Sequence, residues 1–252
     1  MTQSAALEWR VEEACLNAWP ALREVLLDGW VLRFSDGLTR RANSVNPLRA
    51  VAHAAIRHCE ALYRTQRLPT LFRVPSLLDR SVDERLAAAG YTSEGDSCVL
   101  YREIANIAAN SDPDVRILER PTPEWFAAMA ALQNHTLEQA GTYQRIIGQI
   151  LVPSAFAALV VNREIVALAY GALHDALLCY ESVITCRHRR RRGYGRRIVA
   201  ALAAWAHENG AKGACLQVES GNEPARALYD AVGLKQELYR YHYCREPRPR
   251  GG

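Results

Sequence analysis

Short apolar stretches bounded by polar pairs occupy the middle of the second half of the chain and predict β-strands. Three of them follow one another, at residues 155–161, 165–173 and 177–185. The pairs Asn162-Arg163 and His174-Asp175 separate them, and such polar pairs are typical of tight turns. The pattern therefore predicts three consecutive strands joined by short turns.

Helical periodicity and further strands surround this group. Trp125, Met129 and Leu132 share one face of a predicted helix at 123–138, which follows a short strand at 115–118. Residues 142–150 fit neither period clearly. The remaining predicted elements are a helix from Ile198 to a stop at Asn209-Gly210, a strand at 214–219, a helix at 223–232 ended by Gly233 and a strand at 237–244.

The first half of the chain shows the same order of elements. We predict a helix at 11–19, a hairpin of strands 30–34 and 38–45 around Asp36-Gly37, a helix at 51–63, a strand at 69–74, a helix at 81–89 ended by Gly90 and a strand at 97–104. This shared order indicates a diverged internal repeat. The polar segment 107–113 is the expected linker between a first lobe (1–106) and a second lobe (114–246), and 247–252 is an expected mobile tail.

Composition is that of an ordinary globular protein, with 252 residues of which 49% are hydrophobic and 23% charged. No apolar run is long enough to cross a bilayer, and the first residues lack the apolar core of a secretory signal. The seven cysteines form no CxxC pair and the histidines have no partner at ligand spacing, so we expect no metal site and no disulfide framework. These features predict a cytoplasmic protein that does not contact a membrane.

The net charge of +4 is concentrated in one segment, because seven arginines lie between residues 187 and 197. Gly193 and Gly195 lie within this segment, between a predicted strand and a predicted helix. Glycines two residues apart let backbone N–H groups approach a ligand without a Cβ in the way, and the helix start adds the positive end of its dipole. A pyrophosphate is the ligand that this arrangement favours.

A second pattern lies downstream, where Asn222 precedes a short helix and Tyr229 lies on it. Arg190-x-x-Gly193-x-Gly195, followed by Val218-x-x-x-Asn222-x-x-Ala225-x-x-Leu228-Tyr229-x-x-x-Gly233-Leu234, resembles the GNAT superfamily of N-acetyltransferases. The motifs occur in the family's order across about half of the chain. Asp28-Gly29-Trp30 and residues 41–45 resemble the degenerate first lobe of two-lobed bacterial members.

The resemblance implies an α/β fold with a mixed sheet (α+β), built as two tandem GNAT-like lobes that each hold a mainly antiparallel sheet flanked by helices. It also implies acetyl-CoA as the acyl donor. The backbone amides of the loop would bind the coenzyme A pyrophosphate, with Arg190 at its first position, followed by Arg191, Arg192, Gly193, Tyr194, Gly195 and Arg196. Asn222 would contact the pantetheine arm or the reacting region. An N–H near Ile184 or Thr185 would polarise the thioester carbonyl, where strands 177–185 and 214–219 splay apart.

Catalytic roles follow from the same resemblance. Tyr229 would protonate the departing thiolate as general acid. Glu181 and Glu219 are the acids nearest the gap and the candidate general bases, with Glu181 slightly favoured. Arg187 departs from the family, which often has proline there. The first lobe lacks the glycine loop and has Leu86 where the second has Tyr229, so it should neither bind coenzyme A nor transfer an acetyl group.

Three functions remain open from the sequence. The first is transfer of an acetyl group from acetyl-CoA to a primary amine, on a small molecule or a peptide, in a ternary complex. The second is nucleic-acid binding through the arginine cluster, which a single concentrated loop does not favour, so we expect no nucleic-acid partner. The third is an acyl-CoA sensor without activity. Asn222 as a simple helix cap, Tyr229 as a core tyrosine and the glutamates as solvated side chains are the non-catalytic interpretations. The acceptor and the oligomeric state stay undetermined.

Overall fold

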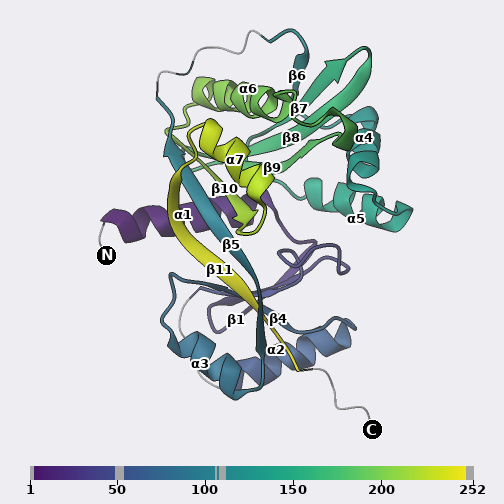
Figure 1. Ribbon diagram of the computed structural model, residues 1–252. Coiled ribbons are helices and arrows are strands. Elements are labelled where there is room, and N and C mark those ends of the chain that lie inside the picture. Colours follow the sequence, from purple (N-terminus) through teal and green to yellow (C-terminus); the bar gives the residue numbers. More distant parts are fainter. Residues whose placement is uncertain (1–2, 49–53, 106, 108–111, 248–252) are drawn as a thin grey trace. The chain divides into compact units, whose positions relative to one another are not determined.

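The computed structural model describes residues 3–48, 54–105, 107 and 112–247 (Figure 1). The chain divides into two compact units. Unit 1 holds Met1–Pro20, Val99–Val218 and Asn222–Leu238, and unit 2 holds Ala21–Cys98, Glu219–Gly221 and Tyr239–Gly252. Both units combine helices with a sheet, as the sequence predicts. Within the described part of the chain, no helix has the length and apolarity that a membrane span requires.

Unit 1 is built on a sheet with the strand order β5-β10-β9-β8-β7-β6. Its strands are β6 (Val115–Leu118), β7 (Ser154–Val161), β8 (Glu164–His174), β9 (Leu177–Thr185), β10 (Gly213–Glu219) and the end of β5 (Thr92–Glu103). Neighbours from β6 to β9 are antiparallel, whereas β9 and β10 are parallel. Both turns of this meander place two residues at positive φ, Asn162 with Arg163 and Asp175 with Ala176, which suits a two-residue hairpin. The second turn therefore lies one residue later than predicted.

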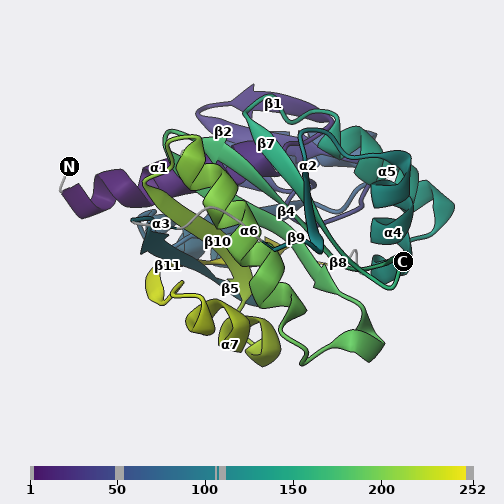
Figure 2. The same cartoon turned by 90° about the horizontal axis from the view of Figure 1, so that it is seen from above.

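Helices cover the two faces of this sheet (Figure 2). α1 (Gln3–Ala18) packs on one face, where the Tyr170 hydroxyl donates to the Ala18 carbonyl at 2.7 Å. α4 (Pro123–Gln133) and α5 (Leu137–Ile147) belong to unit 1 as well. α6 (Tyr194–Glu208) packs on the other face, where the Tyr180 hydroxyl donates to the Val199 carbonyl at 3.3 Å. α7 (Glu223–Ala231) contacts α6.

The helix predicted at 123–138 is in fact two helices. Asn134 adopts the left-handed conformation (φ 55°, ψ 40°) and ends α4. Thr136 then starts α5 with a capping box, in which its hydroxyl accepts from the Gln139 amide at 3.2 Å and the Gln139 side chain accepts from the Thr136 amide at 2.9 Å. The ambiguous residues 142–150 fall mainly within α5.

Unit 2 has the strand order β1-β2-β3-β4-β11-β5. Its elements are β1 (Arg23–Leu27), β2 (Trp30–Phe34), β3 (Val45–Pro47), α2 (Ala54–Thr65), β4 (Leu71–Pro75), α3 (Ser81–Ala88), the start of β5 and the end of β11 (Gln236–Arg245). β3 and β4 are parallel, whereas β1 with β2, β2 with β3 and β4 with β11 are antiparallel. The core is aromatic: Phe72 is buried with its ring edge-on to Trp30 and to Tyr91, at centroid distances of 5.4 and 5.3 Å.

The predicted hairpin of the first half lies elsewhere. The tight turn is at Asp28-Gly29 (φ 49° and 79°) and joins β1 to β2, whereas no strand forms at 38–44. The Asn43 side chain explains this difference, because its Oδ1 accepts from the amides of Ser35 at 2.7 Å and Gly37 at 3.0 Å. These bonds close a longer loop after Asp36-Gly37.

The compact units also differ from the predicted domain boundaries. Residues 1–20 belong with the second half of the chain, because α1 packs on β8 and β9. Residues 239–252 belong with the first half, where β11 pairs with β4 from Tyr241↔Pro75 to Arg245↔Leu71. Residues 108–111 of the predicted linker and residues 248–252 of the predicted tail (247–252) lie outside the described residues.

Candidate functional site

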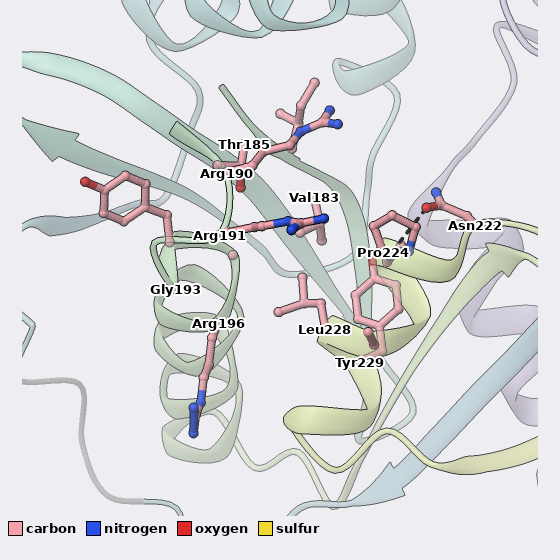
Figure 3. A pocket seen from close by; sticks show the side chains of 15 residues that line it. Val183, Thr185, Arg190, Arg191, Gly193, Arg196, Asn222, Pro224, Leu228 and Tyr229 are labelled. Atoms are coloured by element: carbon pink, nitrogen blue, oxygen red, sulfur yellow. Dashed lines mark hydrogen bonds between the residues drawn. The ribbon is translucent and has the colours of Figure 1, made fainter. Parts of the chain in front are cut away.

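A cavity of about 640 Å³ lies in unit 1 between the end of β9, the start of α6 and α7 (Figure 3). It brings together most residues of the predicted site. Its lining consists of Val183, Ile184, Thr185, Arg190, Arg191, Gly193, Tyr194, Gly195, Arg196, Asn222, Pro224, Ala225, Ala227, Leu228 and Tyr229.

The cavity lies beyond the point where the two parallel strands separate. β9 and β10 pair through Leu177–Cys179 and Gly213–Cys215, and the pairing stops there although both strands continue. The gap that the family resemblance implies is therefore a feature of this chain. A ligand in the cavity can lie against β9 at Val183, Ile184 and Thr185, which are beyond its pairing with β10.

A β-bulge shapes this free edge. Tyr170 of β8 is opposite Glu181 and Leu168 is opposite Ile184, so two residues of β9 are opposite Ala169 alone. The first of them, Ser182, has φ 53°, an unusual value for a non-glycine residue in a strand. After the bulge, Val183, Ile184 and Thr185 line the cavity.

The loop between β9 and α6 presents unsatisfied amides to the cavity. After a 3₁₀ turn at Arg187–Arg189, Arg191 and Gly193 adopt positive φ (60° and 76°), and Gly193 is the N-cap of α6 without a side-chain hydrogen bond. The first amides of α6 are therefore free to bind an anion. A Cβ on Gly195 would lie 2.9 Å from Leu228 Cδ2, so this glycine lets α6 approach α7 closely.

The arginine cluster divides into distinct groups. Arg190, Arg191 and Arg196 line the cavity and are exposed. Arg192 is exposed but does not line it. Arg197 binds Asp112 and Asp114 at 2.6 Å each, and these hydrogen bonds raise the pKa of its guanidinium above the usual range. Arg189 pairs with Glu164 at 3.2 Å, so neither Arg189 nor Arg197 serves the cavity.

α7 places Asn222 and Tyr229 on the opposite wall. Asn222 caps the helix, as predicted, with its Oδ1 accepting from the Ala225 amide at 3.2 Å, and it also lines the cavity. Tyr229 is 7% exposed. Burial is the main cause that raises the pKa of Tyr229 to about 12, and the negative charge of Glu181 adds to it. The phenol is therefore protonated at neutral pH.

The two candidate bases have different surroundings. Glu181 is 4% exposed and interacts electrostatically with Tyr229, although it does not line the cavity. Glu219 belongs to unit 2, where its carboxylate accepts from Arg40 Nη2 at 2.9 Å. Glu219 is engaged with Arg40 and does not line the cavity, whereas Glu181 lies close enough to Tyr229 to affect its pKa, so their positions favour Glu181.

The sequence did not predict some residues of the cavity wall or two clusters of cysteine and histidine side chains. Val183, Pro224 and Ala227 line the cavity, and Val183 does so because of the bulge, which has no reliable sequence signal. His242, which has no ligand-spaced partner in the sequence, lies 2.9 Å from Asp83 Oδ1 and near Cys244. Cys15, Cys179 and Cys215 also converge, with their sulfurs within 4.8 Å of one another. Neither group lines the cavity.

A glycine loop before a helix, a splayed parallel strand pair and a bulged strand together define a GNAT-type acyltransferase. Residues 8–244 match the family model described as "Probable histone acetyltransferase Rv0428c C-terminal", and the chain belongs to this family. It is 23% identical over 239 residues to an uncharacterized N-acetyltransferase of Bacillus subtilis, YobR, covering 93% of this chain and 96% of the relative.

Solved structures show the same fold. A GCN5-related N-acetyltransferase from Kribbella flavida is similar over 100% of this chain and 97% of its own, with a TM-score of 0.71 and 18% identity. A tandem GNAT protein from the clavulanic acid biosynthesis pathway is similar over 81% of this chain and 76% of its own, with a TM-score of 0.65 and 10% identity. These structures confirm the predicted GNAT fold, and the family model with the relative confirms the assignment as an N-acetyltransferase.

Proposed function

We propose that this acyltransferase moves an acetyl group from acetyl-CoA to a primary amine by direct transfer in a ternary complex. The observation that carries the proposal is the 640 Å³ cavity, which combines an anion-binding helix start with a buried phenol. When bound, acetyl-CoA supplies an acetyl thioester, whose carbonyl is the electrophile for the amine.

The walls of the cavity fit a pyrophosphate at one end. A Cβ on Gly193 would meet no heavy atom within 4 Å, so a ligand can approach the backbone there. The exposed arginines Arg190, Arg191 and Arg196 have no acidic partner among the described residues, and each can form charge-assisted hydrogen bonds with phosphate oxygens. The loop residues predicted for the pyrophosphate, Arg192 excepted, therefore share one wall of one cavity.

The free edge of β9 provides the polarising donor. The Cys186 amide donates to the Val166 carbonyl at 2.8 Å, and antiparallel pairs alternate between bonded and non-bonded positions. Ile184, two residues earlier, is thus a bonded position whose N–H is directed at β8. The Thr185 N–H is directed into the gap, so we assign it, rather than Ile184, as the donor to the acyl carrier.

Proton transfers fall to Tyr229 and Glu181. With a pKa raised to about 12, Tyr229 keeps its proton until a thiolate develops next to it, and then donates that proton to sulfur. Glu181 accepts the proton of the incoming ammonium, directly or through water. The reaction needs no covalent enzyme intermediate, because the amine attacks the thioester carbonyl itself.

The experiment combines two measurements on the whole protein. Calorimetric titration with acetyl-CoA tests binding, and release of free thiol across a panel of small amines, polyamines and lysine peptides tests transfer. The family model's description names histone acetylation for another member, so lysine peptides belong in the panel. Binding with amine-dependent thiol release supports the proposal. Absence of binding, or binding without thiol release for any amine, contradicts it.

A further inference from the structure

We infer that Tyr143 is a positioning residue for acyl transfer, because it fixes the β9 bulge through Ser182. The inference rests on the proposed function of the cavity. Tyr143 belongs to α5 and does not line the cavity. Its hydroxyl donates to Ser182 Oγ at 2.9 Å, which links this helix directly to the first residue of the bulge.

The bulge decides which side chains of β9 face the cavity. Tyr180 points toward α6, since its hydroxyl reaches the Val199 carbonyl. In a regular strand, side chains two residues apart share a face, so Ser182 and Ile184 would follow Tyr180 onto that side. Instead Ser182 contacts α5. Thr185 is the residue that faces α6, because its Oγ1 would lie 3.7 Å from a Cβ placed on Gly195. The extra residue therefore reverses the alternation just before the cavity wall.

Ser182 adopts this geometry at a conformational cost. Its φ of 53° lies in the left-handed region, which L-residues other than asparagine and aspartate rarely adopt. Such a conformation persists only where the surroundings hold it. The Tyr143 hydroxyl is the side-chain partner that the structure gives to Ser182.

Tyr143 is itself held rigidly and can act as an anchor. It is 3% exposed, and its ring lies 5.6 Å from the Trp19 ring, 5.7 Å from that of His135 and 6.5 Å from that of Trp125. Removing only the hydroxyl would leave this packing in place. Tyr143→Phe thus separates the bond to Ser182 from the general stability of unit 1.

The test compares Tyr143→Phe and Ser182→Ala with Ser182→Gly. Tyr63→Phe is the matched control, because it removes a buried tyrosine hydroxyl bond of the same 2.9 Å length, to the Arg33 carbonyl in unit 2. We expect Tyr143→Phe and Ser182→Ala each to raise the Kd for acetyl-CoA and lower kcat/KM by about 10-fold. The double variant Tyr143→Phe/Ser182→Ala should show no larger change in Kd or kcat/KM than either single variant, because both substitutions remove the same hydrogen bond.

Two further readouts separate positioning from loss of structure. Hydrogen–deuterium exchange over residues 182–185 should become faster in Tyr143→Phe without ligand, and stay unchanged in Tyr63→Phe. Ser182→Gly should retain binding, because glycine adopts positive φ without help, and adding Tyr143→Phe to it should cause no further loss. Melting temperatures confirm that each variant is folded.

The possible outcomes are distinct. If the parent protein does not bind acetyl-CoA, or binds it without releasing thiol for any amine, the proposed function fails. The inference alone fails if the parent protein is active but Tyr143→Phe matches the Tyr63→Phe control in hydrogen–deuterium exchange, in the Kd for acetyl-CoA and in kcat/KM. Additive losses in the double variant, or an equal loss from Tyr143→Phe in the Ser182→Gly background, would also overturn it.

Discussion

The two halves of the chain, which the sequence indicates to be a diverged repeat, end their short helices in the same way but differ in the side chain four residues before the terminal glycine. Gly90 and Gly233 have φ of 85° and 86°. The Tyr91 amide donates to the Leu86 carbonyl at 3.0 Å, and the Leu234 amide donates to the Tyr229 carbonyl at 2.9 Å. Leu86 and Tyr229 are therefore structurally equivalent, as counting back four residues from each glycine predicts.

The side chains at these equivalent positions have opposite roles. Leu86 is completely buried and packs in the core of unit 2. Tyr229 forms part of a cavity wall in unit 1. The parallel strands of each half also differ, since β3 is only three residues long whereas β9 extends past its pairing with β10. The same order of elements can thus enclose either a closed core or a cavity that is open to a ligand.

The largest effect should come from Tyr229→Phe, which removes the proton but keeps the ring. We expect kcat to fall by about 10²-fold or more, with the KM for acetyl-CoA within about 2-fold of the parent value. Steady-state thiol release at a series of pH values measures this. Unchanged kcat at every pH would mean that Tyr229 resembles Leu86 in being only a packing residue.

The candidate bases offer a second comparison across the two units. Glu181→Gln should lower kcat/KM by about 10²-fold near neutral pH, with a smaller deficit at higher pH, where more of the amine is already deprotonated. Glu219→Gln should stay within about 3-fold, because Arg40 already holds that carboxylate. The pH profiles of both variants check this, and the opposite ranking would transfer the role to Glu219.

Substituting Leu86 and Tyr229 each by the other's side chain tests the comparison through the free energy of unfolding. Leu86→Tyr inserts a larger side chain with a hydroxyl into a closed core and should destabilise the protein by about 1–3 kcal/mol. Tyr229→Leu should leave the protein folded. Urea denaturation followed by circular dichroism compares the two. A Leu86→Tyr protein as stable as the parent would show that unit 2 has room like that of unit 1.

The smallest effect concerns the free energy of unfolding at alkaline pH. The pKa of Tyr229 is raised in the folded state to about 12 from about 10, so its contribution is complete below pH 10 and is lost as pH rises toward 12. By pH 11 the parent should lose about 1 kcal/mol relative to Tyr229→Phe. Urea denaturation of both proteins at pH 8 and pH 11 measures this difference, and an equal loss in both would place the phenol in a water-like environment.

Local signals explain how much the sequence predicted. Gly193 and Gly233 adopt positive φ at turns, and Gly195 allows the close approach of Leu228, so the loop and the α7 end were predicted well. The strand bounds 177–185 agree fully with β9. Long-range pairing has no such local signal, and the sequence therefore missed that α1 packs on β8 and β9 and that β11 pairs with β4. The bulge at Ser182 was missed for the same reason.

Two strands contribute to both units. Thr92–Cys98 of β5 belongs to unit 2 and the rest of β5 to unit 1, and the end of β11, from Tyr239, belongs to unit 2. Expression of either half as a separate fragment would thus leave a sheet without one of its own strands. A truncation that removes the first half would expose the edge of β11 that pairs with β4, and unpaired strand edges promote aggregation.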